Sequence, residues 1–260
     1  MTKIVIASLA LATLCLSFTK EKPFIPTGTI QINDTLFADE VEVTNIGWQE
    51  YEFWTASIYG KNSKEHLAAL PDTLVWREKN SYNEPYVQYY YRHPAYKEFP
   101  VVGISYEQAI AYCKWRTERV KAFLIVKKNF KNQNFEYRLP SKTEWEKLAE
   151  TSSNFLSNNG KNKKGMHLQN CVYADTVSLK ENTCYSNDVT APVYSYWKNS
   201  LGLFNMTGNV AEMVHEKGIS KGGGWRNNLE QCRIGKDAEY TKPSAWLGFR
   251  CVCVIRKSNS

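Results

Sequence analysis

The sequence predicts one irregular α/β (α+β) domain with more loop than usual, and three observations lead to this fold class. The chain has 260 residues, of which 43% are hydrophobic, enough to bury one sizeable core. Aromatic residues make up 13%, while long apolar runs are few, which favours large rings packed between irregular segments. Helical and strand patterns both occur, around a polar, Asn-rich stretch over residues 151–197 that we expect to form long loops.

The first residues have the pattern of an export signal. Lys3 precedes an apolar run, Ile4–Leu14, and the segment Cys15–Ser17 offers a small-x-small cleavage site. The run is too short for a transmembrane helix, which needs about 20 residues; a buried N-terminal element is the alternative. We therefore expect a signal peptide over 1–17 and a mature domain over 18–260, placed in the periplasm or at the outer membrane. Cys15 is an alternative lipid-anchored residue.

Cysteine number and spacing leave the redox chemistry open. Export permits disulfides, and six cysteines that follow Cys15 allow 15 full pairings. The sequence has no CxxC pair and only four scattered His, which argues against a zinc site. The six cysteines are Cys113, Cys171, Cys184, Cys232, Cys251 and Cys253.

Positive charge is concentrated in the middle of the chain, whose formal net charge is +7. Residues 114–164 contain 13 Lys or Arg against 5 Asp or Glu, with basic clusters at 127–131 and 161–164. Such loops suit cell-wall polymer, an anionic lipid surface or an acidic partner protein, and a solvated face is the simpler alternative. Export excludes nucleic acid as the expected target.

Capping residues predict where three helices begin. Thr44 can cap a helix that carries Trp48 and Tyr51. The capping box Ser105-x-x-Gln108 predicts a helix that runs to about Val120. A second box, Ser141-x-x-Glu144, predicts a short helix that buries Trp145 and Leu148.

Alternating and apolar segments predict the strands. We expect a strand pair over 24–32 with a turn at Pro26–Gly28, and a half-buried strand over Glu40–Val43. The end of the chain, residues 248–255, has strand character. Gly222–Gly224 allows a tight turn or a close backbone approach.

Seven segments, in order along the chain, resemble motifs of the formylglycine-generating enzyme, or sulfatase-modifying factor, family. The resemblance covers nearly the whole mature chain and implies a compact α/β fold related to C-type lectins. The segments are Phe24–Gly28, Glu42–Asn45, Phe99–Ser105 with Ala111–Trp115, Tyr137–Glu146, Leu201–Glu212, Lys221–Trp225 and Gly248–Cys251.

A narrower resemblance, over residues 71–120, is to the gliding-motility lipoproteins GldJ and GldK, which are non-catalytic members of this family. It implies an exported scaffold of gliding motility or type IX secretion, with envelope or secretion-machinery proteins as partners. Because Tyr anchors interfaces, we expect a partner surface in this segment. Its residues would be Tyr86, Tyr89, Tyr90, Tyr91 and Tyr96.

The family's oxidase chemistry is incomplete in this chain. The resemblance implies copper held by two cysteines shortly after a Gly-Gly-Ser motif, and a cuprous ion favours thiolates. Here Gly224 replaces the serine, Asn227 stands at the first cysteine position and Cys232 at the second. A neutral amide oxygen cannot replace a thiolate, so we expect a degenerate active site, no catalytic residue and no copper.

The resemblance also implies calcium and one disulfide. The calcium site would use Thr207, Gly208, Asn209, Val210 and Glu212, because calcium takes six to eight oxygens. A second site would lie near Asn170 and Asn187–Asp188. Cys113 and Cys251 match cysteines that are paired in the family's enzymes. Cys171 with Cys184, and Cys232 with Cys253, would then follow by elimination.

Three hypotheses for function remain after the sequence alone. The first is the non-catalytic envelope scaffold. The second is a formylglycine-generating-type oxidase or another enzyme on the same fold, since fold does not dictate function. The third is a lectin-like binder of glycan or peptide, with an open groove lined by Tyr89, Tyr90, Tyr91 or Trp225.

Overall fold

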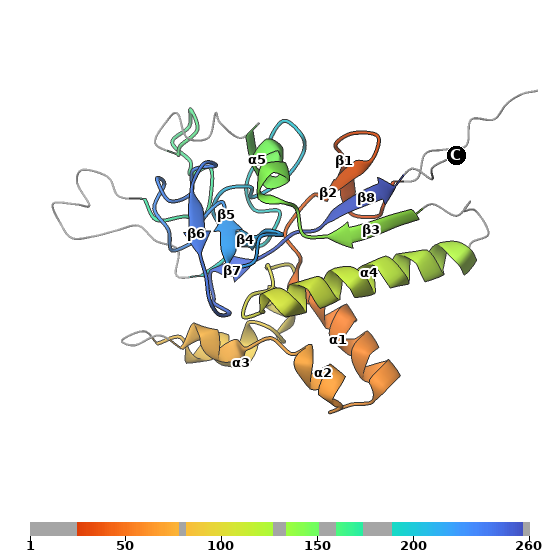
Figure 1. Ribbon diagram of the computed structural model, residues 1–260. Coiled ribbons are helices and arrows are strands. Elements are labelled where there is room, and N and C mark those ends of the chain that lie inside the picture. The colour runs from red at the N-terminus through yellow and green to blue at the C-terminus, as the bar shows by residue number, and fades with distance from the viewer. Residues whose placement is uncertain (1–24, 78–81, 127–133, 151–159, 174–188, 257–260) are drawn as a thin grey trace, which may run out of the picture.

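Two small sheets form the centre of the domain in the computed structural model, which describes residues 25–77, 82–126, 134–150, 160–173 and 189–256 (Figure 1). The first sheet has the strand order β1-β2-β8-β3 and is antiparallel throughout. The second has the order β6-β5-β4-β7, in which only the β4–β7 pair is parallel. The strands are β1 Thr29–Gln31, β2 Leu36–Asp39, β3 Asn134–Arg138, β4 Ala211–Met213, β5 Ile219–Lys221, β6 Asp237–Glu239, β7 Leu247–Gly248 and β8 Val252–Arg256.

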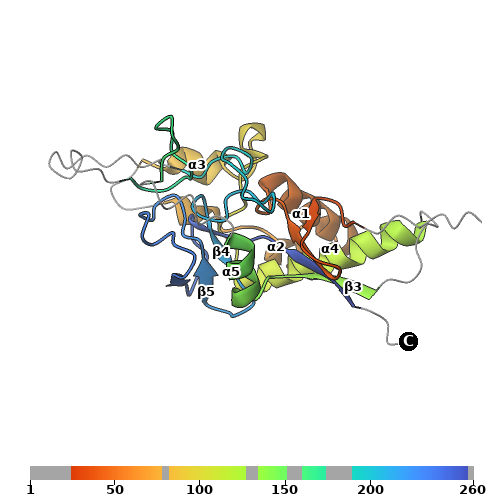
Figure 2. The same ribbon diagram turned by 90° about the horizontal axis from the view of Figure 1, so that it is seen from above.

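Helices lie on both sides of these sheets. In Figure 1 the long helix α4 runs along β3, with α1 and α2 below it and α5 on the opposite side. Seen from above, α4 and β3 extend side by side away from the second sheet (Figure 2). The helices are α1 Asn45–Tyr59, α2 Lys64–Ala68, α3 Glu84–Tyr89, α4 Tyr106–Val126 and α5 Lys142–Glu150, with 3-10 turns η1 Thr73–Trp76 and η2 Pro94–Tyr96.

The three predicted helix starts are confirmed by their hydrogen bonds. The Thr44 hydroxyl accepts from Gly47 N at 3.2 Å and begins α1, which buries Trp48. In the box that begins α4, Ser105 N donates to the Gln108 side chain at 2.7 Å and Gln108 N donates to the Ser105 hydroxyl at 3.2 Å. The helix continues to Val126, past its expected end.

The second capping box holds the start of α5 in the same way. Ser141 N donates to the Glu144 carboxylate at 2.8 Å, and Glu144 N donates to the Ser141 hydroxyl at 3.2 Å. Trp145 and Leu148 are both buried, as predicted. Local spacing therefore fixed each of these helices, because both partners of every capping bond lie within three residues.

Two strand predictions are wrong in position. The strand is Leu36–Asp39, whereas Glu40–Val43 is irregular because its backbone hydrogen bonds go to separate segments. Val43 N donates to Phe249 O, and Val43 O accepts from Val101 N. The turn at Pro26–Gly28 is present, closed by Thr29 N on Pro26 O. The strand that follows it pairs with β2, however, and not with the residues before the turn.

The main core lies where α1 and α4 meet the sheets. The rings of Trp48 and Tyr112 stack at 5.4 Å, and Phe249 packs edge-on against both. Of residues 151–197, the described parts contain no helix or regular strand, in agreement with the predicted loops. None of the helices in the described ranges has both the length and the apolar character that a membrane span requires. The signal segment 1–17 and Cys15 lie outside the described residues.

Candidate functional site

The segment expected to be a degenerate copper site is a closed turn built on glycines. Gly222 and Gly223 have φ of 82° and 62°, in the left-handed region that favours glycine. Asn227 closes the turn, since its side-chain oxygen accepts from Gly224 N at 2.8 Å and its own N–H donates to Gly224 O at 2.9 Å. The residue at the first family cysteine position is thus engaged in holding the backbone.

Gly224 has a packing reason to lack a side chain. A Cβ atom there would lie 2.9 Å from the carbonyl oxygen of Trp246 and 3.3 Å from Asn209 O, which are both backbone atoms. The family serine at this position would therefore require the surrounding backbone to shift. This constraint is not visible in the sequence, because it depends on loops that are far apart along the chain.

Cys232 lies beside Cys171, which differs from the pairing expected by elimination. Both thiols are free and buried, in one cluster with Tyr173 and Leu229. Cys253 belongs to the main core instead, so the expected Cys232–Cys253 pair is not formed. Spacing could not reveal the Cys171–Cys232 contact, and Cys184 lies outside the described residues.

The predicted Cys113–Cys251 disulfide has two facing partners. Both thiols are free and buried, and their sulfur atoms lie 3.5 Å apart. Cys113 comes from α4 and Cys251 from the chain between β7 and β8, as the resemblance implies. The bond itself stays a prediction.

The Thr207–Glu212 loop is organised around the side chain of Asn209. Its amide nitrogen donates to Glu42 at 2.9 Å, and its amide oxygen accepts from Ala191 N at 2.7 Å. Gly208 and Asn209 both have positive φ, and a Cβ at Gly208 would lie 2.6 Å from Asn170 O. This Gly-Asn pair is therefore required by the left-handed turn and by the close approach of Asn170.

Glu212 points away from that loop, toward Arg250. The Arg250 guanidinium donates to both carboxylate oxygens, with the shortest distance 2.6 Å from Nη2 to Oε1. Trp145 Nε1 donates to Oε2 at 2.7 Å. Both side chains of the ion pair are buried, with exposed fractions of 0% and 1%.

These contacts do not fit Glu212 as a calcium ligand. Its charge is neutralised by Arg250, and the Thr207 hydroxyl and the Asn209 carbonyl are engaged with Gln169 and with Trp225 N. In the part of the chain that the structure describes, no group of three or more His, Cys, Asp or Glu could hold a metal. Calcium binding by the loop oxygens alone stays a prediction.

The second expected calcium site is only partly visible. Asn170 donates through its side-chain nitrogen to Val189 O at 3.1 Å and to Asn209 Oδ1 at 3.3 Å, while its carbonyl accepts from Asn209 N at 2.8 Å. Asn170 therefore supports the Asn209 loop. Asn187–Asp188 lies outside the described residues.

Glu42 is a buried carboxyl group next to this network. Its oxygens accept from Asn209 and Asn205, and only 1% of the residue is exposed. Burial raises the pKa of Glu42 to about 7, with nearby Arg250 opposing the rise and Glu212 adding to it. The side chain is thus poised to bind a proton near neutral pH.

The predicted tyrosine surface is wrong for most of its members. Tyr90 and Tyr91 are 2% and 5% exposed, and Tyr86 and Tyr96 are partly buried against the cluster that contains Tyr90. The Tyr90 ring packs at a tilt against Trp76, with centroids 4.6 Å apart, and the Tyr91 hydroxyl donates to Glu52. Only Tyr89, which is 51% exposed, faces solvent. With Trp225 also buried, the expected aromatic groove does not form. These rings pack in the core of an irregular domain that has few long helices.

A hollow of about 450 Å³ lies between α1, α2 and Arg92, and sequence reasoning did not find it. Its polar wall is the buried Glu52, which accepts from Arg92 at 2.7 Å and lies 3.4 Å from His66 Nε2. Burial opposes ionisation, but hydrogen bonds from Arg92, Tyr91 and His66 hold the pKa of Glu52 below its usual value. Phe53, which is 70% exposed, forms an apolar rim.

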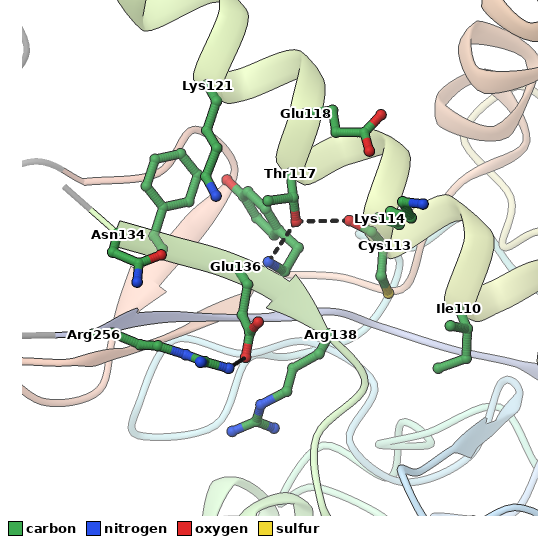
Figure 3. Close-up of a pocket in the computed structure, with 12 residues that line it drawn as sticks. Ile110, Cys113, Lys114, Thr117, Glu118, Lys121, Asn134, Glu136, Arg138 and Arg256 are labelled. Atoms are coloured by element: carbon green, nitrogen blue, oxygen red, sulfur yellow. Dashed lines mark hydrogen bonds and ion pairs between the residues drawn. The ribbon is translucent and has the colours of Figure 1, made fainter. Parts of the chain in front are cut away.

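A second hollow, of about 350 Å³, lies between α4 and β3 (Figure 3). The Thr117 hydroxyl accepts from Tyr137 N at 2.8 Å and donates to Cys113 O at 2.9 Å, so it joins helix to strand. Arg256 pairs with Glu136 at 2.6 Å across its floor.

The buried ion pair predicts how a Glu212 variant will behave. Glu212→Gln leaves the Arg250 charge buried without a full partner, and we expect a loss of about 3 kcal/mol of unfolding free energy. The loss should be the same in calcium and in chelator, because the interaction that the variant loses is the ion pair with Arg250. Thermal or urea unfolding in both solutions measures it. A loss that appears only with calcium present would instead identify Glu212 as a calcium ligand.

The pKa of Glu42 predicts a pH dependence of stability. Between pH 4.5 and 7 the unfolded chain releases this proton while the folded protein keeps it, so the free energy of unfolding falls as pH rises through that window. The fall should reach about 3 kcal/mol. Urea unfolding measured as a function of pH should show that Glu42→Gln removes this dependence of the unfolding free energy on pH, whether or not the variant is more or less stable than wild type. The exposed Glu50→Gln variant is the control and should keep the pH dependence. Equal slopes in wild type and Glu42→Gln would contradict the assignment.

Comparison with known proteins agrees with this geometry. The chaperone protein LppX of Paenibacillus barcinonensis is 26% identical over 182 residues, which cover 55% of this chain and 65% of LppX. PvdO from Pseudomonas aeruginosa has a TM-score of 0.53 at 16% identity, over 84% of this chain and 80% of PvdO. CarF has the same score and identity, over 88% and 96%. At such identity these two structures show the fold alone.

A family model described as the sulfatase-modifying factor enzyme 1-like domain matches residues 11–255. The match covers nearly all of the chain, including the glycine turn, the Asn209 loop and Arg250. The chain therefore belongs to the sulfatase-modifying factor enzyme 1-like family.

Proposed function

We propose that the protein is an exported, non-catalytic member of its family that works as a scaffold in the cell envelope, in gliding motility or type IX secretion. The observation that carries this proposal is Asn227. Its amide closes the glycine turn at the position of the first copper thiol, and Gly224 has no room for the family serine. A relative named as a chaperone protein is in keeping with a role in binding another protein.

The hollow between α1 and α2 is the surface that best suits such a partner, in place of the tyrosine patch. Phe53, which is 70% exposed, lines this hollow, and α1 and α2 carry three further exposed apolar side chains: Ile58 59%, Tyr59 59% and Leu67 52%. Lys61 and Arg92 add positive charge at the rim. Apolar groups next to exposed cations favour a partner segment that carries both aromatic or aliphatic residues and carboxylates.

A formylglycine-generating-type oxidase is the second candidate, and one observation favours it. Cys171 brings a second buried thiol next to Cys232, although from a different loop than the family pair. The presence of two thiols makes a direct assay of this activity necessary.

The non-catalytic proposal predicts that the protein does not convert the cysteine of a sulfatase peptide to formylglycine, even with copper supplied. Mass spectrometry of the peptide after aerobic incubation is the measurement, with an active family enzyme as the positive control. Asn227→Cys should not restore turnover, because Gly224 still departs from the family. Oxygen-dependent conversion by the wild-type protein would favour the oxidase instead.

The partner surface predicts separate effects for surface and core substitutions. Phe53→Ala with Lys61→Ala should abolish gliding or secretion in a complemented deletion strain, while the unfolding free energy changes by about 0.5 kcal/mol or less. Tyr90→Ala is the matched core control and should lower stability by about 3 kcal/mol. Wild-type gliding and secretion with the surface variant would remove this hollow as the partner surface.

A further inference from the structure

Cys171 and Cys232 are brought together by two segments that are far apart in the sequence. Val172 N donates to Asn227 O at 2.9 Å, and Val172 forms a parallel bridge with Asn228. This bridge sets the segment around Cys171 and Val172 against the turn that follows the glycines. The two cysteines are 1% and 0% exposed, in the same small cluster.

The surroundings of the two sulfur atoms are unequal. Gln169 Nε2 donates to Cys171 Sγ at 3.6 Å, and Cys171 packs in one cluster with Tyr173 and Cys232. A Cβ at Gly223 would lie 2.7 Å from Cys232 Sγ, so backbone covers the second sulfur closely. Cys171 therefore has a side-chain donor at its sulfur, whereas the Cys232 sulfur lies against backbone.

This inequality favours one thiolate and one thiol. The hydrogen bond from Cys232 lowers the pKa of Cys171, and the same bond together with burial raises the pKa of Cys232. The thiolate is the reactive form of cysteine, and a neighbouring thiol can resolve its oxidised product.

We propose that Cys171 and Cys232 are a redox modification site that hydroperoxides convert to a disulfide. The Cys171 thiolate attacks one oxygen of hydrogen peroxide, which breaks the O–O bond, gives the sulfenic acid and releases hydroxide. The Cys232 sulfur then attacks the sulfenic sulfur and displaces its hydroxyl group, which leaves as water with the Cys232 thiol proton. The proton that Cys171 lost on ionisation neutralises the hydroxide. In total, two thiols and one peroxide give one disulfide and two waters.

The bond would join two supports of the Asn209 loop. Asn170, next to Cys171, holds that loop through its carbonyl, and the glycine turn before Cys232 contacts it through the Gly208 N to Gly222 O bond of 2.9 Å. A cross-link that closes the chain between residues 171 and 232 restricts the unfolded state. The oxidised protein should therefore unfold at a higher temperature than the reduced protein.

Peptide mapping of the full chain tests the site directly. Trypsin places Cys171, Cys184 and Cys232 on three different peptides, residues 165–180, 181–198 and 227–233, and both Cys251 and Cys253 on residues 251–256. The native, reduced protein is treated with hydrogen peroxide, then unfolded and alkylated without reductant before digestion. We expect a cross-linked pair of peptides 165–180 and 227–233 that reductant separates.

Two variants test the order of the steps. Cys232→Ser should trap a sulfenic acid on Cys171 that dimedone labels, whereas Cys171→Ser should leave Cys232 unlabelled. Cys253→Ser is the control and should keep the cross-link and the rise in unfolding temperature. Full alkylation of both wild-type cysteines after peroxide treatment would overturn the proposal. So would a cross-link of Cys171 to peptide 181–198 or of Cys232 to peptide 251–256.

Discussion

The arrangement of this domain depends on one buried arginine. Arg250 lies between β7 of the second sheet and β8 of the first, and it is fully buried. Its guanidinium donates to Glu212 on β4, to Asp39 O at 3.1 Å at the end of β2, and to Phe204 O at 2.7 Å in the loop before the Asn209 turn. A buried charge with this many partners fixes two sheets and one loop in a single geometry, because no nitrogen can leave its partner without losing a hydrogen bond in a dry interior.

The candidate site follows from that geometry. Glu212 on β4 is held by Arg250 and Trp145, so its carboxylate does not reach the loop, which is organised around Asn209 instead. Asn209 in turn donates a hydrogen bond to Glu42, and burial raises the pKa of Glu42. The glycine turn then packs so closely against Asn209 and Trp246 that a side chain at Gly224 has no room. Gly224 and Asn227, where the family resemblance implies a serine and a cysteine, thus take part in contacts that hold the backbone closed.

Local features of the chain could be predicted from sequence, whereas long-range contacts could not. Both capping boxes and the Thr44 cap form as expected because their partners are three residues apart. The strand at Glu40–Val43 is wrong because alternation there reflects contacts with residues 101 and 249. The tyrosine segment reads as a surface, but Tyr90 and Tyr91 fill the core. The Cys171–Cys232 contact spans loops that no spacing rule connects. The sequence did contain one signal for Arg250. A charged residue between Phe249 and Cys251, in an otherwise apolar segment, indicates a buried ion pair.

A double-mutant cycle on Arg250 and Glu212 tests the central claim most directly. Unfolding free energies of wild type, Arg250→Met, Glu212→Leu and the double variant give the coupling between the two side chains, because contacts with Trp145 and Phe204 cancel. If the pair organises the domain, each single variant is strongly destabilised. The double variant should then be more stable than the sum of the single losses predicts, by about 1–3 kcal/mol. Losses that add to within about 0.5 kcal/mol would contradict the account.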